Sequence, residues 1–238
     1  MYRALIGAAV LVLAVGAGLH AQNQASPLDA PTTLRLPVSL PACGINTVLM
    51  KLARTSRVAT GFEETRDCRG RFPRVDVAYD ADGQTTMTVR QLLDRLVALT
   101  PDYAWRDMHG VAVVRPAPAW ADASDALNAR MASFTFADTT LSETVAAILR
   151  VPPRESHLDA QHFTLAFKGG TLADALNALV LARGGVGWKV GVLYHGSPDT
   201  DPSPSLQVGI WTFNAGDRAP LDGALGMGTP LPRFLSGK

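Results

Sequence analysis

The chain has 238 residues, of which 47% are hydrophobic and 18% are charged, with 22 basic and 21 acidic side chains. Residues 1–21 carry one cation and no acid, so the rest of the chain is formally neutral and gives no electrostatic indication of nucleic-acid binding. After residue 21 no apolar run approaches the roughly eighteen residues of a membrane-spanning helix, and about 200 residues suffice for one large or two small domains.

The N-terminus has the layout of a secretory signal peptide. Arg3 precedes sixteen residues without a charged side chain, and Ala21 is a small residue followed by a polar stretch. We predict cleavage after Ala21, then a flexible segment over residues 22–33, and a periplasmic or secreted location. An uncleaved membrane anchor is the alternative, although sixteen residues rise only about 24 Å as a helix. Membrane contact is expected only if the segment is retained.

Residues 34–116 predict a first β-α-β-α-β-β module. Thr88 is placed to cap its second helix, and Pro101 to stop it. The expected strands are 34–40, 74–79, 103–106 and 111–114, and the expected helices carry apolar stripes at Ile45, Val48, Leu49 and Leu52 and at Val89, Leu92, Leu93, Leu96 and Val97.

The chain contains two cysteines, Cys43 and Cys68. In an oxidising compartment they are natural partners for one disulfide, and closing a loop of about 25 residues contributes on the order of 3 kcal/mol. Two free thiols are the alternative. A metal site built on these two residues is not expected, because neither belongs to a Cys-x-x-Cys pair, and no cofactor is predicted.

Residues 133–214 repeat the pattern as a second, divergent module. Thr171 precedes Trp188 by seventeen residues, the same interval that separates Thr88 from Trp105. An Ala- and Pro-rich linker over 117–132 separates the modules, and a flexible Gly/Pro-rich tail is expected over 215–238. The expected strands are 133–136, 163–167, 186–193 and 206–213, and the expected helices carry apolar stripes at Leu141, Val145, Ile148 and Leu149 and at Leu172, Ala175, Leu176 and Leu179.

The predicted fold class is α+β. Each helix has a single apolar stripe to bury, so each module is expected to form a short sheet with two helices on one face. Alternatively, the two copies pack into one continuous domain, which the short linker also permits.

The first module resembles the short N-terminal domain of secretins and of TonB-dependent signal transducers. The residues that carry the resemblance are Val48–Ala53 with Ser56–Val58, and Thr88–Leu93 leading into Tyr103–Trp105 and Gly110–Val114. It covers about 80 residues, with a weaker similarity in Phe134–Leu149 and Phe163–Lys189. The resemblance implies a non-catalytic module that binds an envelope protein of a secretion, pilus or TonB-linked system. The chain departs from the family in lacking room for a secretin channel or a receptor barrel.

An arginine-rich stretch is the strongest candidate binding site. Arg66, Arg69, Arg71 and Arg74, together with Phe72, place four cations within nine residues. Such a loop is suited to an anionic glycan, a lipid headgroup or an acidic partner, and the disulfide would preorganise it. A solvated loop is the default interpretation.

Candidate catalytic groups are weaker. His157 and His162 are five residues apart, which does not match the spacing of helical zinc ligands, and the neighbouring Ser156 lacks a nucleophile-elbow motif. Glu63 and Glu64 are interpreted as part of a solvated loop. Trp105 and Trp188 are expected to be core residues.

Three hypotheses follow, in order of preference. The first is a non-catalytic envelope protein-interaction module; the second is an anionic glycan- or lipid-binding protein that uses the Arg66–Arg74 loop. The third is an exported enzyme with a site near His157 and His162.

Overall fold

The computed structural model describes residues 26–65, 68, 78–79, 87–153, 160–184, 186–195, 203–212 and 227–230. The predicted signal peptide lies outside this set. Within the described residues, no helix has the length and apolar character needed to cross a membrane.

The described part of the chain contains the helices α1 (Ile45–Ser56), α2 (Val89–Leu99), α3 (Leu141–Leu149) and α4 (Leu172–Arg183). The predicted caps Thr88 and Thr171 are confirmed. Each accepts a hydrogen bond from the backbone N–H three residues later, and the side chain at that position accepts one from the threonine N–H. Thr140 caps α3 in the same way. These reciprocal bonds satisfy N–H groups that the first helical turn leaves unpaired, and so fix where each helix begins.

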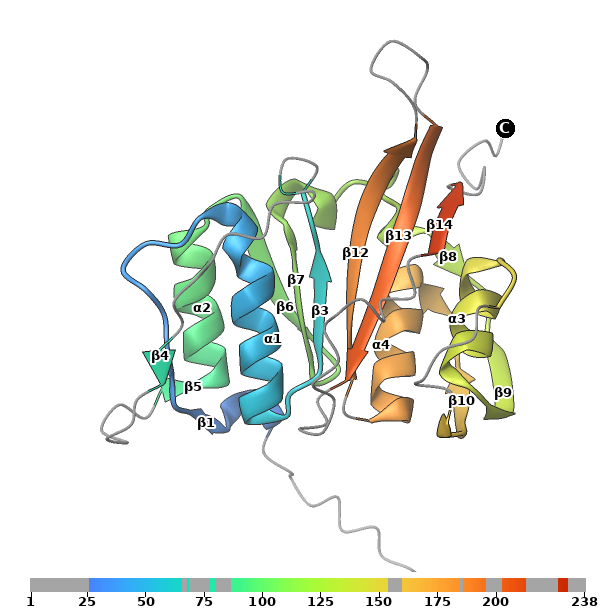
Figure 1. The fold of residues 1–238 in the computed structure, drawn as a ribbon, viewed down its shortest axis with the longest axis horizontal. Helices are drawn as coiled ribbons and strands as arrows, with labels where there is room; N and C mark the ends of the chain where they lie inside the picture. The colour runs from blue at the N-terminus through green and yellow to red at the C-terminus, as the bar shows by residue number, and fades with distance from the viewer. Residues whose placement is uncertain are drawn as a thin grey trace, which may run out of the picture.

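The described strands include a six-stranded sheet in the order β14-β13-β12-β3-β7-β6 (Figure 1). Its members are β3 (Thr60–Glu63), β6 (Tyr103–Met108), β7 (Val111–Pro116), β12 (Val186–His195), β13 (Ser203–Thr212) and β14 (Met227–Pro230). Strand β3 runs parallel to both of its neighbours, β7 and β12, and the other pairings are antiparallel. Strand β3 therefore joins the hairpin of the first half to the hairpin of the second.

Among the described residues, each half also contains two separate two-stranded antiparallel ribbons. In the first half β1 (Pro31–Thr32) pairs with β5 (Met87–Thr88), and β2 (Leu34–Arg35) pairs with β4 (Ala78–Tyr79). In the second half β8 (Arg130–Met131) pairs with β11 (Gly170–Thr171), and β9 (Phe134–Thr139) pairs with β10 (Phe163–Phe167). Strand β5 runs directly into α2, and β11 runs directly into α4.

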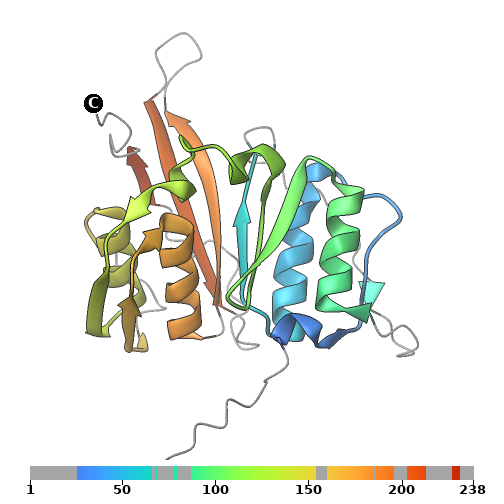
Figure 2. The ribbon, with the colours of Figure 1, turned by 180° about the vertical axis from the view of Figure 1, so that it is seen from behind.

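The six-stranded sheet has a hydrophobic core on each face. In β7, Ala112 and Val114 pack with residues of α1 and α2, whereas Val111 and Val113 pack with residues of α3, α4, β12 and β13. This division follows from the alternation of side chains along a strand. Figures 1 and 2, which view the molecule from opposite sides, show α1 and α2 over one face and α4 over the other.

The predicted α+β class is confirmed, but the two halves share a sheet rather than forming one each. The alternative of a single continuous arrangement is therefore the one observed. The cause is β3, a strand absent from the predicted set. Because it pairs on both edges, the two hairpins cannot form independent sheets.

The segment over 22–33, predicted to be flexible, is folded from its first described residue, Ser26. Ser26 caps the 3-10 helix η1 (Pro27–Asp29), whose Leu28 is fully buried in the first core. The predicted linker over 117–132 is folded as well: it contains η4 (Ala117–Trp120), η5 (Ala126–Asn128) and the buried Leu127. In both segments a single leucine reaches the core, which offsets the entropy of ordering a short polar stretch.

The tail over 215–238, predicted to be flexible, contributes the edge strand β14. Its four residues pair antiparallel with β13, so main-chain hydrogen bonds hold a segment with few core-forming side chains. The remaining residues of the tail lie outside the described residues.

The contact between Gly61 of β3 and Trp188 of β12 gives a first prediction. A Cβ atom at Gly61 would lie 2.3 Å from two carbons of the Trp188 indole, which is fully buried and donates a hydrogen bond to Asn177. We expect Gly61→Ala to lower the free energy of unfolding by about 2–3 kcal/mol, because the indole has no room to move. Denaturant titration measures this loss.

Gly191, on the adjacent strand β12, is the matched control. A Cβ atom there would meet Glu64 Oε2 at 3.5 Å, an ordinary contact, so Gly191→Ala is expected to change stability by less than about 1 kcal/mol. Equal losses from the two substitutions would contradict the close approach of β3 and β12.

Candidate functional site

The carboxyl end of β3 carries consecutive polar residues, Glu63, Glu64 and Thr65. The expectation that the two glutamates lie in a solvated loop is wrong: their side chains are only 14% and 11% exposed, and both form ion pairs. They are buried because β3 is covered by a strand on each edge. We call this region the junction, made of Glu63, Glu64, Thr65, Tyr103, Arg115, Asp125, Lys189 and the Cys43–Cys68 disulfide.

Arg115 is the most deeply buried charge of the junction, with a side chain that is 1% exposed. Its Nε donates to Glu63 Oε2 at 2.6 Å, and its Nη2 donates to Asp125 Oδ1 at 2.6 Å. Nη1 donates to Asn128 Oδ1 at 2.8 Å, and the guanidinium lies 5.0 Å from the ring centroid of Trp120. One guanidinium is thus held by two carboxylates, one from β3 and one from the segment that connects the two halves.

Burial changes the protonation of Glu63. Burial, reinforced by the negative charge of Asp125, raises the pKa of Glu63 from 4.5 to about 7, although Arg115 opposes the rise. Two carboxylates that share one cation in a desolvated site favour retention of one proton. The junction therefore changes charge near neutral pH.

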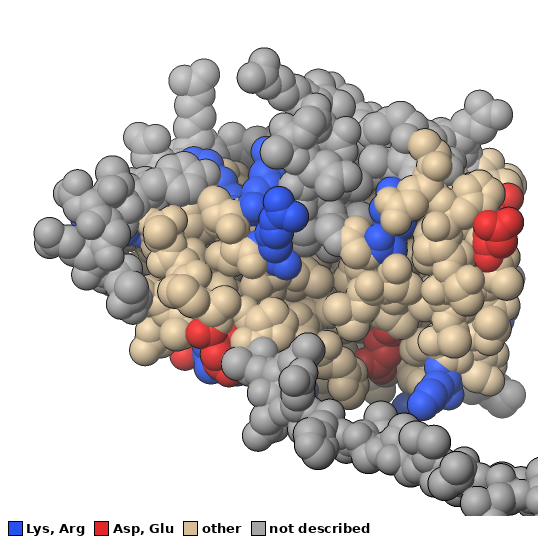
Figure 3. All heavy atoms as spheres, turned by 90° about the horizontal axis from the view of Figure 1, so that it is seen from below, with Lys and Arg blue, Asp and Glu red and all other residues tan. Residues whose placement is uncertain are grey.

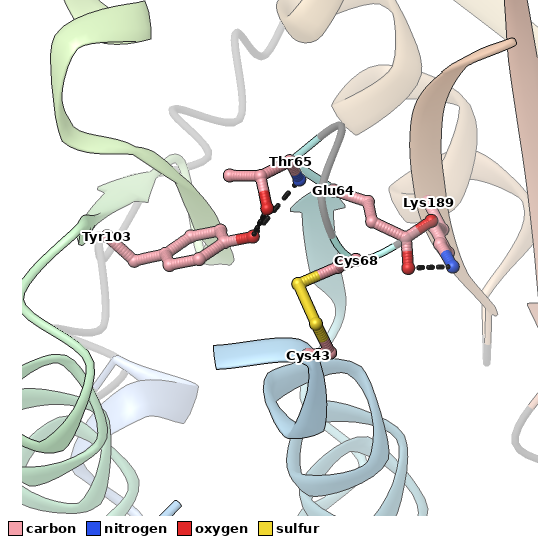
Figure 4. The surroundings of a disulfide bond; sticks show 6 residues. All are labelled: Cys43, Glu64, Thr65, Cys68, Tyr103 and Lys189. Carbon is pink, nitrogen blue, oxygen red and sulfur yellow. Dashed lines mark hydrogen bonds and ion pairs between the residues drawn. A yellow bond between two sulfur atoms is a disulfide. The ribbon is translucent and has the colours of Figure 1, made fainter. Parts of the chain in front are cut away.

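Glu64 and Thr65 connect the same end of β3 to the two hairpins (Figure 4). Glu64 Oε1 accepts from Lys189 Nζ at 2.8 Å, which ties β3 to β12 of the second half. The Tyr103 hydroxyl lies 3.1 Å from Thr65 Oγ1 and accepts a hydrogen bond from Thr65 N at 3.1 Å, which ties it to β6 of the first half. Side chains from three strands thus converge where β3 ends.

The predicted disulfide between Cys43 and Cys68 is present, beside these contacts (Figure 4). Cys43 lies in the 3-10 helix η2 (Ala42–Gly44), immediately before α1, and Cys68 follows the end of β3. The Cys68 N–H also donates to the Thr65 carbonyl at 3.1 Å, so the chain turns back from β3 toward the start of α1. A disulfide fits an oxidising compartment outside the cytoplasm.

The predicted anion-binding residues Arg66, Arg69, Arg71, Phe72 and Arg74 lie outside the described residues. The structure does place Thr65 and Cys68, and both residues belong to the junction. On the face shown in Figure 3, the described Lys and Arg side chains lie in several separate places, and acidic side chains lie on the same face.

Of the candidate catalytic residues, His157 lies outside the described residues and His162 is exposed. The His162 Nδ1 atom lies 3.1 Å from the Asp138 carbonyl oxygen and 3.2 Å from its carboxylate. Within the described part of the chain, no group of three or more His, Cys, Asp or Glu side chains is placed to hold a metal ion.

Trp188 is fully buried, as predicted for a core residue, whereas Trp105 is only partly buried. Arg115 and Asp125 were not among the functional residues predicted from the sequence. The alternation of side chains along β7 could have identified Arg115. Val111 and Val113 face the core, and Arg115 lies on the same face of the strand. A charge at such a position is buried and needs acidic partners.

Removal of the disulfide gives a second prediction. The double substitution Cys43→Ala with Cys68→Ala is expected to lower the free energy of unfolding by about 3 kcal/mol, because the bond closes a loop of 25 residues in the unfolded chain. Denaturant titration with and without a reductant measures the effect. Reduction should destabilise the wild type and leave the double variant unchanged; a wild type insensitive to reduction would contradict the prediction.

The proton on Glu63 gives a third prediction. Because the folded pKa of about 7 lies above the unfolded value of 4.5, the stability contributed by this proton is fully present below pH 4.5 and is lost as the pH rises through 7. The loss between pH 5 and pH 8 is expected to be up to about 3 kcal/mol. Urea titrations at both values measure it.

Glu63→Gln is the control for this pH dependence. The amide preserves the shape of the side chain and its acceptor for Arg115 but does not titrate, so the variant should be less sensitive to pH over this interval than the wild type. A variant with the same pH dependence as the wild type would show that another group is responsible.

Comparison with known proteins assigns no relative to this fold and site. Family models, curated proteins and solved structures all give no match. The role of the junction therefore has to be inferred from its contacts.

Proposed function

We propose that the chain is an exported, non-catalytic protein-interaction module of the cell envelope, of the type of the short N-terminal domains of secretins and TonB-dependent transducers. The disulfide supports an oxidising location. The segments on which the family resemblance rests include core and cap residues: Val48, Leu49 and Val113 are fully buried, and Thr88 caps α2. These residues are therefore structural ones, as the resemblance implies for a module without catalytic chemistry.

The observation that carries the proposal is the way in which the two halves associate. Strand β12 pairs in parallel with β3 in the register Trp188 to Gly61, Lys189 to Phe62 and Val190 to Glu63. Addition of a strand to a sheet edge is also a general mode of association between separate proteins, since main-chain hydrogen bonds supply affinity and adjacent side chains supply specificity. The pairing of β12 with β3 is thus an intramolecular example of the contact by which such a module would bind another protein.

Crosslinking in intact cells tests the proposal. The full chain, expressed with residues 1–21 in its cell of origin, is expected to appear in the periplasmic or secreted fraction with its cysteines oxidised. Formaldehyde should then join it to a discrete envelope protein, identified by mass spectrometry. A chain that lacks residues 1–21 is the control, because it stays in the cytoplasm and should give none of this product.

Two results would overturn the proposal. One is a full-length chain that remains in the cytoplasm with reduced thiols. The other is an exported chain that gives no protein crosslink beyond the background of an unrelated exported protein.

A further inference from the structure

Two tryptophans make the same side-chain hydrogen bond in the two halves of the chain. Trp105 Nε1 donates to Asp94 Oδ1 at 2.8 Å, and Trp188 Nε1 donates to Asn177 Oδ1 at 2.8 Å. In each half the acceptor follows the helix-capping threonine by six residues, and the tryptophan follows it by seventeen. Strand β6, which contains Trp105, is therefore the counterpart of β12, which contains Trp188.

The beginnings of the two halves match in the same way. Val89 N donates to the Ala30 carbonyl at 3.0 Å, and Leu172 N donates to the Ala129 carbonyl at 3.0 Å. Each of these carbonyls follows a short 3-10 helix, η1 or η5, that carries a buried leucine. The equivalence of β6 and β12 thus rests on contacts at both ends of the repeated unit.

The two equivalent strands use their outer edges differently. The outer edge of β12 is covered by β3, and Glu64 N donates to the Val190 carbonyl at 2.8 Å. Strand β6 ends the sheet and has no strand on its outer edge among the described residues. The Asp102 carbonyl bonds inward to Ala117 N, so by alternation the N–H and C=O groups of Trp105 and Asp107 point outward.

The surroundings of the two tryptophans differ accordingly. Trp188 is fully buried, and its indole lies against the backbone of Gly61 on β3. Trp105 is only partly buried, and the Arg90 guanidinium lies 5.6 Å from its ring centroid. The side of the Trp105 indole that corresponds to the Gly61 contact has no strand beside it among the described residues.

A basic residue follows the tryptophan in both strands. Lys189 of β12 forms an ion pair with Glu64, three residues after Gly61 on the added strand. Its counterpart Arg106 is exposed and stacks on Trp120, at 4.4 Å from the ring centroid, and it has no acidic partner among the described residues. The outer edge of β6 therefore offers main-chain groups, an indole face and a cation in the same order as β12.

We propose that the outer edge of β6 binds an extended strand of a partner protein, in parallel, as β12 binds β3. The partner strand places a glycine or other small residue against Trp105 and a carboxylate, three residues later, near Arg106. This inference rests on the proposed function and names the surface through which it acts.

A second copy of this chain cannot repeat the β3–β12 contact at this edge. In a second copy, the strand equivalent to the one that β12 binds is β3, and both of its edges are already paired, with β7 and β12. If two β6 edges paired antiparallel so that Trp105 met Asp107, Arg106 would lie directly opposite Arg106 of the other copy. Like charges in directly opposed positions destabilise a strand pair. This register is therefore disfavoured, and dimerisation through β6 is a separate outcome of the test below.

A synthetic peptide with the sequence of residues 58–65 is the probe, tested on the oxidised mature chain by nuclear magnetic resonance. We expect amide shifts at Trp105 and Asp107. In the chain itself the Glu64 N–H donates to the Val190 carbonyl, so in the peptide the same N–H is expected to donate to the Asp107 carbonyl. N-methylation at the Glu64 position removes this donor and should weaken binding at least about tenfold. N-methylation at the Glu63 position should preserve binding, because that N–H points away from the β6 edge.

A charge reversal on the protein provides a second measurement. Arg106→Glu is expected to weaken peptide binding by about tenfold. Lys168→Glu is the matched control: Lys168 is exposed and lies between β10 and β11 of the second half, so this variant should bind as the wild type does. Thermal midpoints of both variants check that folding is preserved.

Several outcomes would overturn the proposal. They are the absence of shifts at millimolar peptide, equal weakening by the two N-methyl peptides, shifts confined to β12, and dimerisation through β6 in the absence of peptide. The crosslinking experiment in cells distinguishes failure of the β6-edge proposal from failure of the proposed function. A crosslink that survives Arg106→Glu, together with a peptide that does not bind, leaves the interaction function intact and removes the β6 edge as its site.

Discussion

The pairing of β3 between β7 and β12 is the interaction on which the rest of the structure depends. Strand β3 has only four residues, yet it gives the first hairpin a third strand and joins the second hairpin to the same sheet. Three of its four positions make specific contacts. Gly61 leaves room for the Trp188 indole, Phe62 enters the core beneath α1 and α2, and Glu63 reaches the buried Arg115. Helices on opposite faces, two cores and the junction all follow from the position of this one short strand.

Buried charge at the junction contributes specificity at a cost in stability. Desolvating Arg115 is unfavourable, and the two carboxylates that compensate it leave a surplus that favours a proton on Glu63. The same groups come from β3, from β7 and from the segment between the halves. An alternative register of β3 would leave at least one of them buried without a partner. The main effect of this network is therefore to select one arrangement of the two halves, rather than to raise the free energy of unfolding.

The sequence predicted the elements that have a strong local signal, and it failed where structure depends on distant contacts. Helical periodicity and the threonine caps located α2 and α4, and the spacing from cap to tryptophan matched β6 with β12. Strand β3 was missed because four residues with a glycine give no periodicity, and its stability comes from two distant hairpins. Leu28 and Leu127 lie in polar segments, so burial of a single leucine gave no pattern to detect. Arg115 was detectable in principle, as a charge on the core face of β7, but its partners Glu63 and Asp125 are brought to it only by the fold.

The association of the two halves through strand edges makes the β3–β12 contact the central claim. Native-state hydrogen exchange tests it most directly, because the Glu64 amide donates to Val190 across this contact. If the halves form one sheet, this amide exchanges as slowly as the amides between β6 and β7 and opens only with global unfolding. If it exchanges rapidly while the hairpin amides stay protected, the halves are separate domains and the shared sheet is contradicted.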